Sequence, residues 1–203
     1  MNFSLSNKRS KEEKFWNWFS KSQDTFYHEI ENLEVRDEIL TDLKSELNKV
    51  HPNLVFEFSP IHENGVREFT ISAEGVKDFF PYVEGLIEKA PEIKNWQFNA
   101  FRQRIPGDDL QIQYGDLNIG YSDIYFRYQD GKYGEIGIEL NIRDFDESPQ
   151  TQNAIYILLD GLIGEYDITL GPDWIEWVKL DESNIENLNP ITSLRGLIDE
   201  KKK

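Results

Sequence analysis

The sequence predicts an α+β protein with a mostly antiparallel or mixed sheet, helices largely on one face, and two helices at the N-terminus. Two observations lead to this class. Residues 66–104 alternate with the period of a strand, change to a helical period, and then alternate again. That change of period is typical of a strand–helix–strand unit. The other predicted strands follow one another through short turns, which favours antiparallel or mixed pairing beneath helices.

One domain over residues 1–203 is expected from the length, with flexible ends at residues 1–9 and 199–203. The hydrophobic fraction of 38% is modest, but it includes 13 Phe, 9 Tyr and 5 Trp. Because each aromatic side chain buries a large area, these residues can still build a substantial core.

The first two predicted elements are amphipathic helices. Residues 10–13 read Ser-Lys-Glu-Glu, which has the form of a capping box, so the first helix is expected to begin there. A second helix is expected from about Glu34 to Val50. It should end before Pro52, since the residue before a proline avoids helical geometry.

Strands are expected in the middle of the chain, interrupted by one helix. Residues 54–58 alternate as a strand, and Asn64-Gly65 predicts a hairpin turn to the next strand. Apolar residues then recur at helical spacing, and the proline at position 81 places the start of a regular helix near Asp78. Further strands are expected from Trp96 onward and over residues 110–114, 123–128 and 133–142.

The C-terminal part is expected to contribute a helix, a strand and a short helix. The helix ends near Ile163, with Gly164 suited to its C-terminus. A strand follows around residues 174–178, and Asn189-Pro190 is expected to begin the last helix. Polar residues alternate with apolar ones along residues 133–142, so one face of the sheet is expected to meet water.

The formal net charge is −16, and it is unevenly distributed. Residues 1–105 have 18 acidic and 14 basic side chains, a net of −4, whereas residues 106–203 have 20 acidic and 8 basic, a net of −12. Such a surface repels phosphate backbones and anionic lipids, so neither nucleic acid nor membrane is an expected partner. A basic protein partner or a cation would suit it, or the acidity serves only solubility.

The chain contains no cysteine, which excludes disulfides, thiolate catalysis, Cys-ligated zinc and iron–sulfur clusters. The three histidines have no metal-ligand spacing, and no P-loop, GxGxxG or GxSxG motif is present. We therefore expect no cofactor and no metal. The N-terminus has no apolar signal segment and the chain no membrane-length apolar stretch, so a cytoplasmic protein is expected.

Two groups of carboxylates are candidates for a site. Glu135 and Glu139 share a strand face and would form an acid/base pair if one were desolvated; otherwise they simply face solvent. Asp144, Asp146 and Glu147 form an acidic loop without the glycine and glutamate of an EF-hand. The loop would bind a cation weakly, or would complement the dipole of the helix that follows.

Arginines and tryptophans provide the other candidates. Arg102 lies near Trp96 and Phe101 in sequence, where a guanidinium can recognise a carboxylate or stack on a base, or form an internal ion pair. Trp16 and Trp18 point about 200° apart around a helix. Either one of them is exposed or covered by a partner, or the helix is buried on two sides.

Three motifs carry a family resemblance: Phe-Trp-Asn-Trp-Phe at residues 15–19, Ile-Ser-Ala-Glu-Gly at 71–75, and Leu-Asp-Gly-Leu-Ile-Gly-Glu at 159–165. The sequence over most of residues 14–167 resembles a family of uncharacterised bacterial cytosolic proteins. The third motif departs from the family pattern at Ile163, where the family has leucine. This resemblance implies a single-domain bacterial protein and brings no activity, cofactor or catalytic residue.

The sequence leads to two hypotheses about function. In the first, the protein is a non-enzymatic interaction protein, such as an inhibitor or immunity protein, that presents an acidic surface to a basic or neutral protein partner. In the second, it is a small hydrolase or ligand-binding enzyme in which Glu139, Glu165 and Arg102 converge in a cleft. No catalytic residue is assigned, and the candidate binding residues are Trp16, Trp18, Arg102, Glu139, Asp144, Asp146, Glu147 and Glu165.

Overall fold

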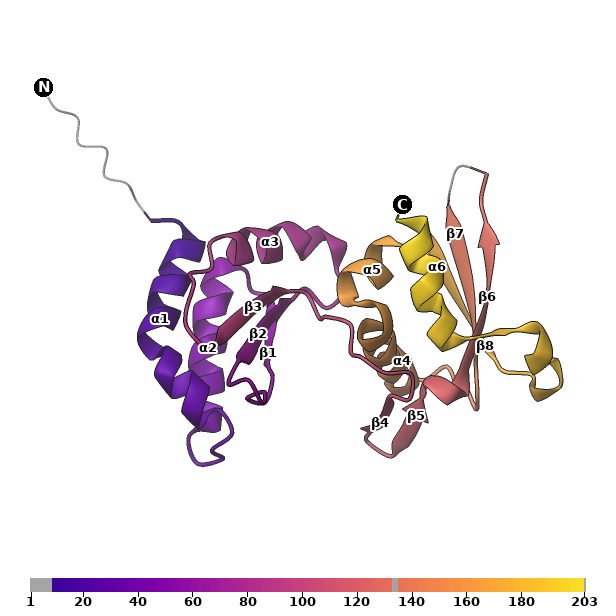
Figure 1. Cartoon of the computed structure of the whole chain (residues 1–203), viewed down its shortest axis with the longest axis horizontal. Coiled ribbons are helices and arrows are strands. Elements are labelled where there is room, and N and C mark those ends of the chain that lie inside the picture. Colours follow the sequence, from indigo (N-terminus) through magenta and orange to yellow (C-terminus); the bar gives the residue numbers. More distant parts are fainter. Residues whose placement is uncertain (1–8, 133–134, 203) are drawn as a thin grey trace, which may run out of the picture. The chain divides into compact units, whose positions relative to one another are not determined.

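The computed structural model describes residues 9–132 and 135–202, and the chain divides into two compact units (Figure 1). The N-terminal unit comprises residues 1–101 and the C-terminal unit residues 102–203. Each unit combines helices with strands, so the α+β class is confirmed. The expectation of one domain over the whole chain stays a prediction, and its flexible ends at 1–8 and 203 lie outside the described residues.

The helices of the N-terminal unit are α1 (Lys11–Glu29), α2 (Arg36–Val50) and α3 (Phe80–Glu88). The predicted capping box is present: Ser10 Oγ accepts the Glu13 N–H at 3.2 Å, and the Ser10 N–H donates to the Glu13 carboxylate at 2.8 Å. A 3₁₀ turn (Lys77–Phe79) precedes α3, so the regular helix starts later than expected. Its proline lies in the first turn, where no backbone donor is needed.

Three strands form the sheet of this unit: β1 (Val55–Phe58), β2 (Arg67–Ser72) and β3 (Trp96–Ala100), in the order β1-β2-β3. β1 is antiparallel to β2 through the predicted Asn-Gly turn, where Gly65 has φ 75°. β2 is parallel to β3, with α3 between them in sequence. The sheet is therefore mixed, as the change of period along residues 66–104 predicts.

The core of the N-terminal unit lies on one face of this sheet. The register places Phe58 and Phe98 on either side of Phe69, and all three belong to the same hydrophobic cluster as the aromatic residues of α1. The ring of Phe19 on α1 packs in a tilted orientation 4.9 Å from that of Phe69, measured between ring centroids. The opposite face has polar side chains such as Asn99 and Glu68, which hydrogen bond to each other. Helices on one face are thus confirmed for this unit.

The C-terminal unit contains a β-hairpin and a four-stranded sheet. The hairpin consists of β4 (Gln111–Tyr114) and β5 (Leu117–Gly120). The sheet has the order β8-β7-β6-β9, in which β6 is antiparallel to β7 and β7 is parallel to β8. Its strands are β6 (Ile124–Asp130), β7 (Ile136–Ile142), β8 (Trp174–Lys179) and β9 (Asn189–Pro190).

The helices of this unit are α4 (Pro149–Ile163), α5 (Glu165–Leu170) and α6 (Leu194–Lys201). Short 3₁₀ turns cover Tyr121–Asp123, Glu182–Asn187 and Ile191–Ser193. Gly164 separates α4 from α5 with φ 87°, a value that favours glycine. Asn189 and Pro190, expected to begin the last helix, instead form β9, and the residues at 199–201 extend α6.

Apolar residues of β7 and α4 build the core of the C-terminal unit. Ile136, Ile138, Leu140 and Ile142 alternate along β7 and share a cluster with the buried face of α4. The other face of β7 was expected to meet water, but its Gly137 and Asn141 are buried. The indole of Trp174 lies directly across Gly137, because an added Cβ there would stand 1.9 Å from Trp174 Cε2. Glycine is required at this close approach.

Candidate functional site

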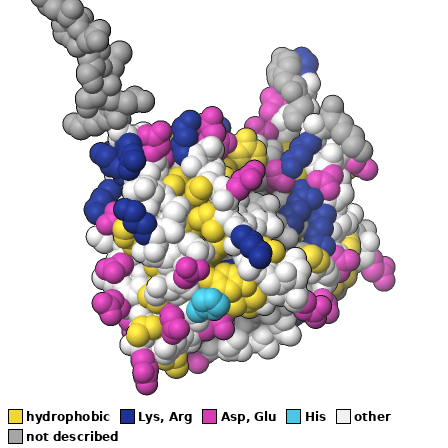
Figure 2. All heavy atoms as spheres, turned by 60° about the vertical axis from the view of Figure 1, so that its left-hand side comes forward, with side chains coloured by type: hydrophobic (Ala, Val, Ile, Leu, Met, Phe, Trp, Pro, Cys, Tyr) yellow, Lys and Arg dark blue, Asp and Glu magenta, His cyan; other side chains and the backbone are white. Residues whose placement is uncertain are grey.

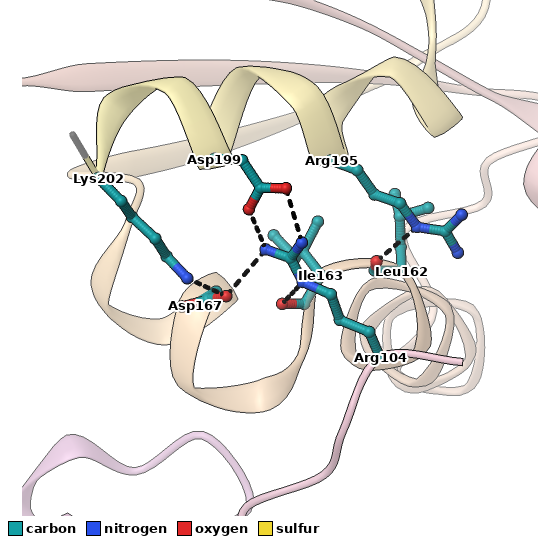
Figure 3. A network of polar contacts seen from close by, with 7 residues as sticks. All are labelled: Arg104, Leu162, Ile163, Asp167, Arg195, Asp199 and Lys202. Carbon is teal, nitrogen blue, oxygen red and sulfur yellow. Dashed lines mark hydrogen bonds and ion pairs between the residues drawn. The ribbon is translucent and has the colours of Figure 1, made fainter. Parts of the chain in front are cut away.

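A network of charged side chains joins three segments of the C-terminal unit (Figure 3). Arg104, which precedes β4, donates to both carboxylate oxygens of Asp199 on α6, at 2.7 and 3.0 Å. It also donates to Asp167 on α5 at 3.0 Å and, through Nε, to the carbonyl oxygen of Ile163 at 2.8 Å. Lys202 forms a second ion pair with Asp167 at 2.5 Å.

Arg102 lies two residues earlier and connects the same segment to the junction of α4 and α5. Its guanidinium pairs with Asp160 at 3.2 Å. Its backbone N–H donates to the carboxylate of Glu165 at 3.1 Å, and its carbonyl oxygen accepts the Glu165 N–H at 3.0 Å. Glu165 is fully buried. Two of the predicted site residues, Arg102 and Glu165, are therefore in direct contact.

A surface hollow of about 360 Å³ lies over this network. Three basic and two acidic side chains line it, so the hollow is less acidic than the unit as a whole. It could hold a small anion only by competing with the carboxylates that already pair with the basic groups. The lining residues are Arg102, Gln103, Arg104, Ile163, Gly164, Tyr166, Asp167, Asp199 and Lys202.

Arg104 chiefly stabilises the fold, because it connects α5, α6 and the end of α4 beneath this hollow. The hydrogen bond to Asp199, followed by the one to Asp167, raises the pKa of Arg104 above its ordinary value, although partial burial acts in the opposite direction. The guanidinium is therefore charged at every pH at which the protein folds, and it cannot exchange protons with a substrate. This chemistry fits the attachment of α6 to α5.

Removing the Arg104 side chain is expected to destabilise the C-terminal unit. Arg104→Ala should lower the free energy of unfolding by about 1–3 kcal/mol, because it removes the donor to the Ile163 carbonyl oxygen and the charged hydrogen bonds to Asp167 and Asp199. Lys202→Ala is the matched control, since this exposed cation shares Asp167, and it should cost about 0.5 kcal/mol or less. Urea unfolding followed by circular dichroism measures both changes. Equal losses in the two variants would contradict the structural role of Arg104.

Glu139 does not line this hollow. It lies on β7, where Arg127 of β6 donates to its carboxylate at 2.6 Å and Asn141 donates at 3.0 Å. The hydrogen bond from Arg127 lowers the pKa of Glu139 below its ordinary value. An ionised, engaged carboxylate is a poor general acid at neutral pH. Of the three residues predicted to converge in a cleft, only Arg102 and Glu165 lie together. Glu139 lies elsewhere in the unit.

The lowered pKa of Glu139 predicts a pH-dependent contribution to stability. The contribution is complete above the pKa of an unfolded glutamate and is lost as the pH falls through the folded value. Glu139→Gln should therefore be less stable than the wild type at neutral pH, and this difference should shrink in acid. Urea unfolding at pH 7 and at about pH 3 measures it. A difference that stays constant between the two pH values would disprove the linkage.

The acidic loop before α4 satisfies its own polar groups. Asp146 accepts the Ser148 N–H at 3.0 Å, and this backbone hydrogen bond lowers the pKa of Asp146. Ser148 in turn caps α4 by accepting the Thr151 N–H at 3.2 Å. Asp144 and Glu147 are exposed and have positive φ values of 52° and 59°. Within residues 9–132 and 135–202, no group of three or more His, Cys, Asp or Glu is arranged to hold a metal ion.

The two tryptophans of α1 face in different directions. Trp16 is only 3% exposed, its Nε1 donates to the carbonyl oxygen of Leu86 at 2.6 Å, and its ring lies 4.5 Å from Phe98. Trp18 is half-buried and contacts Phe26 at 5.3 Å, measured between ring centroids. Trp16 is therefore a core residue of the N-terminal unit, and Trp18 packs at the margin of that core.

Arg67 is a buried arginine that was not among the predicted site residues. Arg67 is 1% exposed at the start of β2, where it donates to the carbonyl oxygen of Phe26 at 3.3 Å and pairs with Glu31. Its Nε has no hydrogen-bond partner in the described part of the chain. The burial of Arg67 could have been predicted from the alternation, because Arg67 shares the buried strand face with Phe69 and Ile71.

No family model, curated protein or solved structure matches the chain. The resemblance to uncharacterised bacterial proteins stays a prediction and transfers no role to any residue. Among the described helices, none is both long and apolar enough to cross a bilayer. The fold and its contacts thus define an α+β protein with a charged network in its C-terminal unit.

Proposed function

We propose that this is a non-enzymatic cytoplasmic interaction protein that presents an acidic surface to a basic protein partner. One observation carries the proposal. The C-terminal unit has 20 acidic and 10 basic side chains, and at least seven of the basic side chains that the structure describes form ion pairs with carboxylates of the same unit. The seven are Arg102, Arg104, Arg127, Arg143, Arg195, Lys201 and Lys202.

This internal pairing affects the electrostatic potential around the C-terminal unit. Since most of its cations are already matched, the surplus carboxylates are left to face solvent and set a negative potential. A negative potential attracts a basic partner, speeds the encounter and becomes weaker with added salt. On the face shown in Figure 2, side chains of both signs alternate with hydrophobic ones, so the acidity there is a net property and not one continuous patch.

The roles of the candidate catalytic groups also support the proposal. Glu139 is held ionised by Arg127, Glu165 accepts a backbone N–H in the interior, and Arg102 pairs with Asp160. Each of these groups has a contact that maintains the fold. The same negative charge argues against nucleic acid and anionic membranes as partners. An inhibitor or immunity role is one version of this function.

Affinity capture from the source organism tests the proposal. The tagged full-length protein should retain a stoichiometric basic protein at low salt and lose it at high salt, because exposed charges are screened. Mass spectrometry identifies the retained protein. An acidic partner, or a column that retains nothing at low salt, would contradict the proposal.

A small hydrolase or ligand-binding enzyme is the second candidate. One observation favours it: Arg102 lines a surface hollow, next to Arg104 and Tyr166. We place it second because Arg102 and Arg104 are already paired with carboxylates, so a ligand would have to displace them.

A further inference from the structure

We propose that the free edge of β8 is the docking site for that partner, which adds an extended, lysine- or arginine-rich segment as a further strand. The inference rests on the proposed function and specifies where and how the partner binds. Strand addition to a sheet edge is a recurring mode of peptide recognition, in which main-chain hydrogen bonds supply affinity and alternate side chains supply selectivity.

The first argument is that β8 is a free edge of the sheet. It stands at the end of the order β8-β7-β6-β9 and pairs with β7 only. Over the described residues, no hydrogen bond reaches the backbone groups on its outer side. The opposite edge of the same sheet is closed differently, by a strand of two residues that includes Pro190. Proteins commonly protect edges with short strands and prolines, and β8, with six residues, has neither device.

The second argument is the exposed aromatic side chain at the start of this edge. Trp174 is 43% exposed although it is a large hydrophobic residue. Its indole is fixed against the backbone of Gly137, so it presents a flat surface at little cost in conformational entropy. Tryptophans in such positions often dominate the binding energy of protein interfaces.

The third argument is charge, which identifies the chemistry of the occupant. Asp173, Glu176 and Asp181 are exposed along β8 and its two ends, against the single cation Lys179. Arg127, on the neighbouring part of the sheet, is already paired with Glu139. An incoming strand would therefore meet a net negative edge. Lysine or arginine at alternate positions is the complement, and an acidic strand would be repelled.

Lys179 allows a sharp test of the edge. The Leu180 N–H donates to the carbonyl oxygen of Ile142 on β7 at 2.8 Å, so the N–H of the preceding residue points to the outer side. Lys179→Pro removes that outward donor without touching the ladder to β7, and the extended backbone of Val178 is compatible with a following proline. Lys179→Gln is the matched control, because it removes the same charge and keeps the N–H.

The probes are two short synthetic peptides, one alternating lysine with valine and one alternating glutamate with valine. The lysine peptide should bind the wild type and Lys179→Gln with slower amide exchange along β8, and the glutamate peptide should not bind. Lys179→Pro should bind the lysine peptide at least about tenfold more weakly. Equal binding by the two variants, no binding to the wild type, or protection confined to other strands would overturn the inference.

The capture experiment separates a failure of the β8 site from a failure of the proposed function. If both Lys179 variants retain the same basic partner from the lysate, the proposed function stands and the β8 site is wrong. If Lys179→Gln retains the partner and Lys179→Pro loses it, with both variants folded by circular dichroism, the site is supported. If neither variant nor the wild type retains any protein, the proposed function fails and the site fails with it.

Discussion

Replacing Trp16 with alanine is expected to lower the free energy of unfolding of the N-terminal unit by about 3–5 kcal/mol. Two losses combine. The indole is 3% exposed among the aromatic residues of α1, β2 and β3, so its removal leaves a cavity in a close-packed core. The carbonyl oxygen of Leu86 also loses the donor that Nε1 provides at 2.6 Å. Urea unfolding followed by circular dichroism measures the change.

Trp18→Ala is the control for this prediction. It removes the same side chain two residues along the same helix, but from a half-buried position. The expected loss is about 1–2 kcal/mol, in proportion to the smaller area that the indole buries. If Trp18→Ala were as damaging as Trp16→Ala, the orientation of α1 would have to be different.

Leu158→Ala is expected to have a comparable effect on the C-terminal unit, about 2–5 kcal/mol. Leu158 lies at the centre of α4 and has no exposed surface, and it belongs to the cluster that contains the apolar face of β7. The neighbouring side chains are held by regular elements on both sides, so the cavity cannot collapse fully. The range reflects how far the surrounding residues can relax.

Ile157→Ala provides a closely matched comparison, because it removes a side chain of the same size from the adjacent position. Ile157 is 43% exposed. Its replacement should cost less than about 1 kcal/mol, since alanine also has the higher helix propensity. A similar loss in both variants would show that α4 buries a different face from the one described.

Most regular elements could be predicted because their signals are local. The capping box at Ser10, the Asn-Gly turn at Gly65 and the stripe on α4 each occupy a few neighbouring residues, and the structure has all three. α5 was missed because six residues make fewer than two helical turns, and β5 because its four residues end in a glycine, which has no side chain to extend the alternation. β9 was missed because its pairing with β6 depends on a distant part of the chain.

The candidate site was predictable only in part, for a similar reason. Arg102 was noted for its charge and its neighbours in sequence, but its contacts are with Asp160 and Glu165, about 60 residues away. No spacing in the sequence connects these residues. The free edge of β8 could not be predicted from the sequence either. Alternation indicates that a segment forms a strand, but it does not indicate whether that strand lies at the edge of the sheet.

The boundary after residue 101 has a consequence for synthesis on the ribosome. Each unit is built from a continuous stretch of chain, so the first can fold while the second is still being translated. Its last residue closes it: the Phe101 N–H donates to the carbonyl oxygen of Ile71, and its ring packs 4.3 Å from Phe80. At roughly 5–20 residues per second, translation of the remainder gives the first unit several seconds alone. The acidic C-terminal unit, which would recruit a partner, therefore emerges after the N-terminal unit.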